Sequence, residues 1–213
     1  MKLSVQVYVI TSMNTRRLAI LGSTGSIGQS TLDVVVEHPG AFEIRALAAH
    51  SNIDVLEQQY HRFHPEYLGV IDPDRGQELA TRLSGESVTV VVGEDELVRL
   101  AALPKLDMVV NAVVGAAGLR ASLEAIRSGL PLALANKESL VAGGPLFEPL
   151  MKKHGGTILP IDSEHSALWQ VLRAGNKEEI RRLIITASGG PFRTMPIEQF
   201  QTITAEQALD HPT

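Results

Sequence analysis

The sequence contains no cysteine. This absence excludes disulfide bonds, iron–sulfur clusters, zinc sites built on thiolates and every mechanism that uses a cysteine nucleophile. A chain without disulfides also fits a reducing compartment.

Long apolar runs are missing as well. The best candidate for a membrane span, Met108 to Leu119, is too short and is interrupted by Asn111. The first thirteen residues pair Lys2 with an apolar stretch but lack the small-residue cleavage site of a secretory signal. We therefore predict a cytoplasmic protein without a membrane partner.

An excess of positive charge is missing too. Lysine and arginine number 19 against 24 aspartates and glutamates, which gives a net charge of −5. Such a chain has no overall attraction to a phosphate backbone, so we expect no nucleic-acid partner. Hydrophobic residues make up 44% of the 213 residues, which is typical of a folded protein with one large or two small domains.

Apolar strand patterns alternate with helical patterns along most of the chain. The strands are continuously apolar, which favours a parallel sheet with helices on both faces. We therefore predict an α/β, Rossmann-like doubly wound sheet followed by the start of an α+β catalytic domain. Residues 139–144 are small, and we expect them to be flexible. The expected strands are 18–21, 42–48, 67–71, 88–92, 108–114, 132–135, 158–161 and 183–187; the expected helices follow the glycine loop to about residue 38 and then span 53–63, 75–83, 94–103, 119–128, 145–153 and 164–172.

A glycine-rich turn, Gly22 to Gly28, follows the first strand. Backbone N–H groups and a positive helix end at this place can hold a pyrophosphate, although the turn also fits a ligand-free connection. The second strand ends in His50, Ser51 and Asn52 without an acidic residue that would hold the 2′-hydroxyl of NAD. The pattern therefore favours NADP, with these three residues as donors to its 2′-phosphate.

Two carboxylates follow the strand 158–161. Asp162 and Glu164 alternate along an extended segment, so they point to one side and offer oxygen ligands to Mg²⁺ or Mn²⁺. Alternatively, Ser163 caps the following helix and Glu164 interacts with its positive end. Lys137 and Glu138 follow another strand end, either as site residues or as an exposed pair. Ser188 lies in a Ser-Gly-Gly turn that either presents donors to an anion or only turns the chain.

Five segments together resemble the 1-deoxy-D-xylulose 5-phosphate reductoisomerase family: GSTGSIG, ANKESLVAGG, LPIDSEHSALWQ, ITASGGPF and the terminal HPT. The resemblance covers residues 17–213. It implies an enzyme that uses NADPH and a divalent metal, Mn²⁺ or Mg²⁺ with Co²⁺ as an alternative. The reaction rearranges and reduces its sugar phosphate to 2-C-methyl-D-erythritol 4-phosphate, in the non-mevalonate route to isoprenoids. The resemblance also implies that the full-length enzyme is a homodimer.

The resemblance further implies roles for individual residues. Lys137 and Glu164 would be catalytic, and Asp162 and Glu164 would bind the metal. The implied NADPH contacts are Thr24, Gly25, Ser26, Ile27, Asn52, Asn136 and Glu138, and the implied substrate contacts are Lys137, Ser163, Glu164, Ser188 and His211.

The sequence departs from the family in two ways. Some members carry Gly-Lys before the asparagine, where this chain has His50-Ser51. In the family, the sequence continues beyond the HPT motif with a segment that carries the third acidic metal ligand. We therefore interpret the chain as an amino-terminal fragment that is inactive by itself. Its expected parts are an extension at 1–14 with Met13 as an alternative start, an NADPH-binding domain at 15–156 and the beginning of a catalytic domain at 157–213.

Two other functions compete with this interpretation. A semialdehyde dehydrogenase has a similar glycine loop but acylates a cysteine, which this chain lacks. A non-catalytic nucleotide-binding module stays open, because a fragment of an enzyme can retain only that function.

Overall fold

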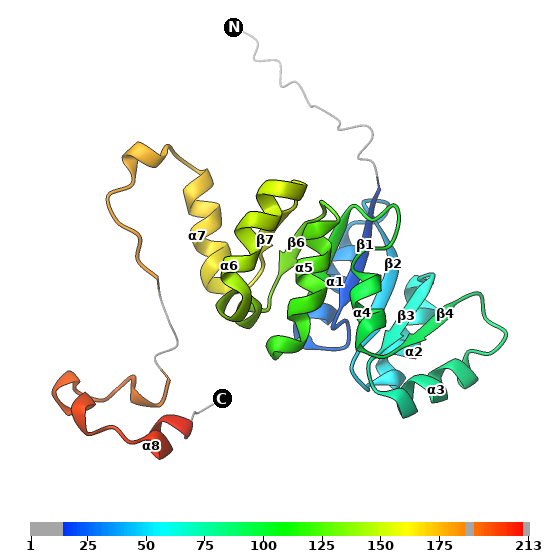
Figure 1. Cartoon of the computed structure of the whole chain (residues 1–213), viewed down its shortest axis with the longest axis horizontal. Coiled ribbons are helices and arrows are strands. Elements are labelled where there is room, and N and C mark those ends of the chain that lie inside the picture. Colours follow the sequence, from blue (N-terminus) through cyan, green and yellow to red (C-terminus); the bar gives the residue numbers. More distant parts are fainter. Residues whose placement is uncertain (1–14, 186–189, 211–213) are drawn as a thin grey trace, which may run out of the picture. The chain divides into compact units, whose positions relative to one another are not determined.

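The computed structural model describes residues 15–185 and 190–210. The chain divides into two compact units, of which the first ends at Asp162 and the second begins at Ser163. Figure 1 shows the first unit as a twisted sheet with helices packed against it.

The first unit contains a seven-stranded, fully parallel sheet in the order β4-β3-β2-β1-β5-β6-β7. From β1 the chain builds outward to β4, then returns to place β5 on the other side of β1. The loops after β1 and β5 therefore diverge to opposite sides, which is where doubly wound sheets bind ligands. The predicted α/β class is confirmed. The strands are β1 (Arg16–Leu21), β2 (Phe42–Ala49), β3 (Tyr67–Val70), β4 (Thr89–Val92), β5 (Met108–Asn111), β6 (Pro131–Leu134) and β7 (Thr157–Pro160).

Helices cover both faces of this sheet. Side chains alternate along β1, so that Leu18 and Ile20 join one core cluster while Ala19 and Leu21 join the other. The first cluster includes residues of α1, α2 and α3, and the second includes residues of α4, α5 and α6. No helix in the described part of the chain is long and apolar enough to cross a membrane. The helices are α1 (Ser26–Glu37), α2 (Ile53–Phe63), α3 (Pro73–Arg82), α4 (Glu94–Leu100), α5 (Leu119–Arg127) and α6 (Lys137–His154).

The prediction that residues 139–144 are flexible is wrong, because α6 begins before this segment and continues through it. The Asn136 side chain accepts a hydrogen bond from the Ser139 backbone N–H at 2.9 Å and so caps the helix. Gly143 lies against α5, where an added Cβ would come within 2.5 Å of the Leu119 Cδ1 atom. Small residues in this segment therefore allow two helices to approach, and do not loosen the chain.

The position of β7 also bears on the domain boundary. Pro131 pairs with Thr157 and Leu134 with Pro160, so β7 is an edge strand of the same sheet. The first compact unit consequently extends to Asp162, whereas the sequence suggested a division after residue 156. That functional division stays a prediction.

The second unit is built mainly from short helices. The predicted strand at 183–187 is wrong for its described residues 183–185, which are not in a strand. Leu183, Ile184 and Ile185 are 53%, 71% and 63% exposed, and none pairs with a strand in the described part of the chain. A β-branched run needs such a partner to form a sheet. The elements are α7 (Ser163–Arg173), α8 (Ala205–Leu209) and three 3₁₀ segments, η2 (Lys177–Glu179), η3 (Gly190–Phe192) and η4 (Ile197–Thr202).

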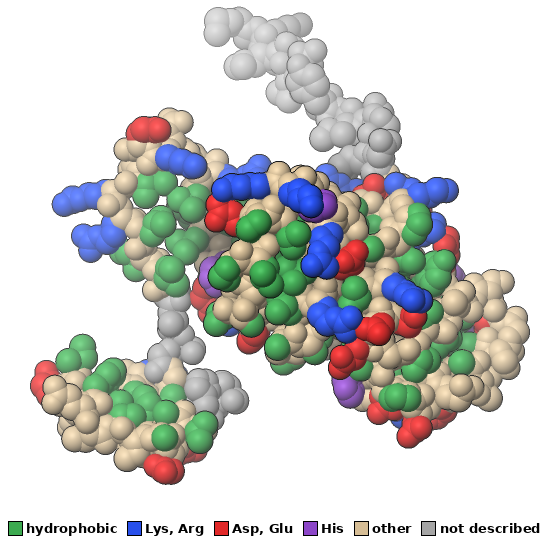
Figure 2. Space-filling model, viewed as in Figure 1, with side chains coloured by type: hydrophobic (Ala, Val, Ile, Leu, Met, Phe, Trp, Pro, Cys, Tyr) green, Lys and Arg blue, Asp and Glu red, His purple; other side chains and the backbone are tan. Residues whose placement is uncertain are grey.

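Charged side chains of both signs are interspersed over the face shown in Figure 2. Exposed ion pairs one helical turn apart also occur on α4, α5 and α6: Arg99–Glu96, Arg127–Glu124 and Lys152–Glu148. Exposed pairs of this kind contribute little to stability.

A stronger ion pair joins the starts of β1 and β5. Asp107 accepts hydrogen bonds from the Arg17 side chain at 2.9 and 3.0 Å and from the Arg17 backbone N–H at 2.8 Å. The guanidinium hydrogen bonds, followed by the backbone one, lower the pKa of Asp107 from 3.8 to about 2. Because the folded pKa lies below the unfolded value, the pair stabilises the protein above about pH 4, and this contribution is lost as the pH falls toward about 2.

We expect Asp107→Asn to lower the free energy of unfolding by about 1 kcal/mol at neutral pH. The value is modest because the Asp107 side chain is 35% exposed, so solvent screens the pair. Urea denaturation at several pH values measures the difference, which should shrink as the pH falls below about 4. A difference that stays constant down to about pH 2 would contradict the assignment.

Candidate functional site

The candidate site lies at the edge of the sheet where the strands end. Leu21 at the end of β1 pairs with Ala48 in β2 and with Asn111 in β5, and Asn111 pairs in turn with Leu134 of β6. Since all these strands are parallel, the segments that follow them emerge at one edge. This edge brings together the glycine loop, the 50–52 segment, the 112–118 segment and the start of α6.

The glycine loop is held against its neighbours by two glycines. Gly22 has a φ of +83°, and an added Cβ would lie 2.7 Å from the Ala112 carbonyl group. At Gly28, an added Cβ would lie 2.3 Å from the Gly22 oxygen and 2.5 Å from the Ser23 Cα. Any side chain at Gly28 would therefore push α1 away from the loop. These two glycines are required by the fold itself.

The third glycine of the motif, Gly25, is not required by contacts within the protein. Gly25 is the N-cap of α1 with a φ of −79°, which any residue adopts. An added Cβ would meet the Gly22 oxygen at 3.5 Å, an ordinary contact. Gly25, Ser26 and Ile27 are exposed, and Thr24 is half-buried beside them. The backbone at the positive end of α1 is thus open to close approach by an anionic group.

A buried pair of polar side chains joins the glycine loop to α2. The Ser23 hydroxyl donates to the Gln59 side-chain oxygen at 2.7 Å, and the Gln59 side-chain amide donates to the Ser23 carbonyl at 2.9 Å. Ser23 is fully buried and Gln59 is 7% exposed. The sequence analysis did not identify this pair. A signal was present, because Gln59 is a polar residue next to Tyr60 and one turn after Leu56 on the apolar side of α2.

A cavity of about 340 Å³ opens beside the glycine loop. Its walls include Gly22, Thr24 and Gly25 from the loop, the Ala49–His50 end of β2, and residues 112–114 after β5. Most of the lining residues are glycine, alanine or larger apolar residues such as Ile71 and Leu97. Such a space suits a flat organic group that lies next to an anion bound at the helix end.

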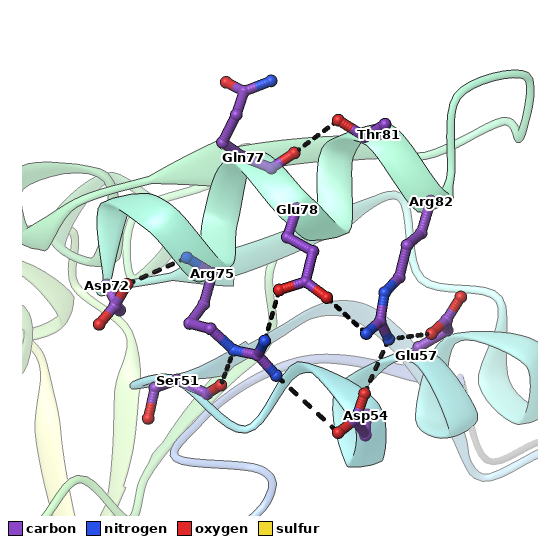
Figure 3. A network of polar contacts seen from close by, with 9 residues as sticks. All are labelled: Ser51, Asp54, Glu57, Asp72, Arg75, Gln77, Glu78, Thr81 and Arg82. Atoms are coloured by element: carbon purple, nitrogen blue, oxygen red, sulfur yellow. Dashed lines mark hydrogen bonds and ion pairs between the residues drawn. The ribbon is translucent and has the colours of Figure 1, made fainter.

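The end of β2 carries polar groups but no carboxylate between residues 48 and 52. His50 and Asn52 are exposed, and the Asn52 side chain caps α2 by accepting from the Val55 N–H at 3.3 Å. Figure 3 shows Arg75 of α3 pointing toward this segment, where its Nε donates to the Ser51 carbonyl at 3.4 Å. The sequence analysis did not identify Arg75, since nothing local signals that α3 approaches the end of β2.

Buried asparagines organise the ends of β5 and β6. Asn111 is fully buried and donates to the Gly118 carbonyl at 2.8 Å and to the Ser122 hydroxyl at 2.7 Å. Asn136 is 4% exposed, and its amide donates to the carbonyls of Val113 and Gly115. The Asn136 side chain is therefore engaged inside the protein, and its predicted contact with a cofactor stays a prediction.

The remaining predicted residues occupy the starts of two helices. Lys137 and Glu138 are exposed in the first turn of α6, within the first unit. Asp162 follows β7 and is half-buried at the end of that unit. In the second unit, Ser163 begins α7 and its hydroxyl donates to the Glu164 carboxylate at 3.1 Å.

Two predicted substrate contacts, Ser188 and His211, lie outside the described residues. Among residues 15–185 and 190–210, no group of three His, Asp or Glu side chains is placed to hold a metal ion. Asp162 and Glu164 have oxygen donors of the right type for a hard cation. Their predicted role as metal ligands stays a prediction.

Comparison with known proteins identifies related sequences along nearly the whole chain. A family model described as 1-deoxy-D-xylulose 5-phosphate reductoisomerase matches residues 18–144, and one described as the C-terminal domain of that enzyme matches residues 158–213. A reductoisomerase of this name from Geotalea uraniireducens is 45% identical over 197 residues, which are 92% of this chain and 51% of that protein. The protein of the same name from Nitrosomonas europaea is 46% identical over 207 residues, covering 93% and 50%.

Solved structures give the same result. The chain is similar to 1-deoxy-D-xylulose 5-phosphate reductoisomerase from Zymomonas mobilis in complex with NADPH, with a TM-score of 0.82 and 42% identity over 93% of this chain and 52% of that one. It is also similar to a DOX-P reductoisomerase in complex with NADPH, fosmidomycin and magnesium, with a TM-score of 0.77 and 41% identity over 92% and 51%. The chain thus spans about half the length of the relatives it matches.

Proposed function

The chain belongs to the 1-deoxy-D-xylulose 5-phosphate reductoisomerase family, and from this premise we propose that it binds NADPH at the carboxyl edge of its sheet. The observation that carries the proposal is the open backbone at Gly25, where no protein atom requires a glycine. A ligand that approaches the backbone closely explains its presence. The adjoining cavity of about 340 Å³ has room for part of the nucleotide.

In this proposal the glycine loop holds the pyrophosphate. Thr24, Gly25, Ser26 and Ile27 lie at or before the first turn of α1, where backbone N–H groups and the helix dipole favour negative charge. Asn52 would bind near the 2′-phosphate. Asn136 and Glu138 would contact the other end of the dinucleotide from the start of α6.

The substrate would be 1-deoxy-D-xylulose 5-phosphate, rearranged and reduced to 2-C-methyl-D-erythritol 4-phosphate. Lys137, Ser163, Glu164, Ser188 and His211 would position its oxygens, and a positioned substrate gives NADPH a defined carbon to reduce. Asp162 and Glu164 would hold Mg²⁺, Mn²⁺ or Co²⁺. When bound, the metal polarises the substrate carbonyl.

We propose that these 213 residues alone bind NADPH without turning the substrate over. Support comes from the comparison with relatives, because the chain spans about half of their length. A cation held by two carboxylates depends on water and substrate for its other ligands. Cytoplasmic location and homodimerisation of the whole enzyme are further proposals, the first supported by the absence of cysteine and the second by family membership alone.

Titration with NADPH and NADH tests the proposal. We expect one molecule of NADPH to bind per chain, followed by the fluorescence of the reduced nicotinamide or by calorimetry, and NADH to bind more weakly. The physical reason is that the end of β2 has no carboxylate. A carboxylate at this place would repel the 2′-phosphate of NADPH. Failure to bind either dinucleotide would refute the proposed function.

A further inference from the structure

The end of β2 lacks a permanent positive charge of its own. The segment His50, Ser51 and Asn52 contains no lysine or arginine. A 2′-phosphate bound there carries between one and two negative charges. In sites of this topology, the phosphate is accommodated by an arginine close to the tip of the second strand.

The fold places the guanidinium group of Arg75 near the end of β2. Arg75 lies in the first turn of α3, and the Asp72 side chain, by accepting from the Arg75 backbone N–H at 3.0 Å, caps that helix. Its Nε donates to the Ser51 carbonyl at 3.4 Å, which ties the side chain to the segment that follows β2 (Figure 3). The Arg75 side chain is 36% exposed, so its position is restrained while solvent still reaches it.

Neighbouring carboxylates leave one end of this guanidinium weakly engaged. Glu78 accepts a hydrogen bond from Arg75 Nη1. Arg75 Nη2 approaches Asp54 at 3.8 Å, a distance too long for a hydrogen bond. Arg82 forms an ion pair with the other carboxylate oxygen of Asp54, at 2.7 Å. It also pairs with Glu57 and Glu78. Arg82 therefore contacts all three carboxylates and offsets one of their three negative charges. Arg75 Nη2 has only the 3.8 Å approach to Asp54, so it can turn to a phosphate oxygen.

We propose that Arg75 binds the 2′-phosphate of NADPH and thereby sets the preference of this site for NADPH over NADH. The inference rests on the proposed function, because it assigns one residue of the same nucleotide site. Arg75 acts on specificity, since NADH has no phosphate at this position. Glu78 opposes it by competing for the same guanidinium.

The test compares the ratio of NADPH to NADH affinity in four forms of the whole chain. Arg75→Gln should weaken NADPH binding by about 10- to 100-fold, the size of a lost hydrogen bond between charged groups, and leave NADH binding unchanged. Glu78→Gln should raise the preference for NADPH by about two- to fivefold, because one exposed ion partner is removed. Arg127→Gln is the matched control, since it removes an ion pair of the same i,i+3 spacing on α5, at the far end of the sheet's strands.

The outcomes separate the two proposals. If the unaltered chain binds neither dinucleotide, the proposed function fails and the role of Arg75 fails with it. If the unaltered chain prefers NADPH and Arg75→Gln keeps that preference, only the role of Arg75 is overturned. Equal losses of NADPH and NADH affinity would also overturn it, because they would show that Arg75 only joins α3 to the end of β2.

Discussion

Gly28→Ala is expected to abolish NADPH binding and to destabilise the protein by about 3 kcal/mol or more. The added methyl group would lie 2.3 Å from the Gly22 oxygen and 2.5 Å from the Ser23 Cα, and both are backbone atoms that cannot rotate away. Relief of this clash must move α1 away from the glycine loop. That movement would also separate the helix end from the pyrophosphate position.

Gly25→Ala provides the matched control within the same motif. Its methyl group meets no protein atom closer than 3.5 Å, so the free energy of unfolding should change by less than about 1 kcal/mol. NADPH affinity should nevertheless fall about tenfold or more, because the methyl group occupies the path by which the pyrophosphate approaches. Urea denaturation and NADPH titration measure the two effects separately. Unchanged NADPH affinity in Gly25→Ala would place the nucleotide elsewhere.

Asp162→Asn and Glu164→Gln should each reduce catalysis by about a thousandfold or more while NADPH binding is unchanged. Metal polarisation of a carbonyl contributes several kcal/mol, and each 1.4 kcal/mol corresponds to a tenfold change in rate. The assay follows NADPH oxidation with 1-deoxy-D-xylulose 5-phosphate and Mg²⁺ or Mn²⁺. Because we expect no turnover by the 213 residues alone, the variants are tested in this chain joined to the carboxyl-terminal half of a relative.

Glu148→Gln serves as the control for that experiment. Glu148 is an exposed acid on α6 that pairs with Lys152 at 2.7 Å, and it should not affect turnover. Full activity in either metal-ligand variant would refute the assignment of that carboxylate. Turnover by the 213-residue chain at the rate of the joined protein would refute the expectation that it is inactive alone.

The sheet was predictable because its signals are local. Continuous apolar runs mark buried parallel strands, and helix α2 begins at Ile53 and ends at Phe63 as predicted, between the Asn52 cap and the turn before Pro65. The glycine spacing likewise located the loop after β1. Its three glycines could not be ranked from sequence, since the contacts of Gly22 and Gly28 involve Ala112 and the loop backbone.

The errors arose where tertiary contacts decide the outcome. Small residues in 139–144 suggested flexibility, but capping by Asn136 and close packing on Leu119 extend α6 through them. The described residues 183–185 of the apolar run have no partner strand in the part of the chain that the structure describes, although the pattern of the run assumed one. Arg75 and Ser51 are 24 residues apart in the sequence, so no local pattern predicts the hydrogen bond from Arg75 to the Ser51 carbonyl.

Hydrogen exchange with and without NADPH tests the central claim most directly, because it locates the bound nucleotide. NADPH should slow the exchange of backbone amides in residues 22–29, 50–54 and 112–118, the three segments at the carboxyl edge of the sheet around β1. Amides at the opposite edge, such as those of residues 127–130, should be unaffected. NADPH binding that leaves the amides of residues 22–29 unprotected would contradict the account.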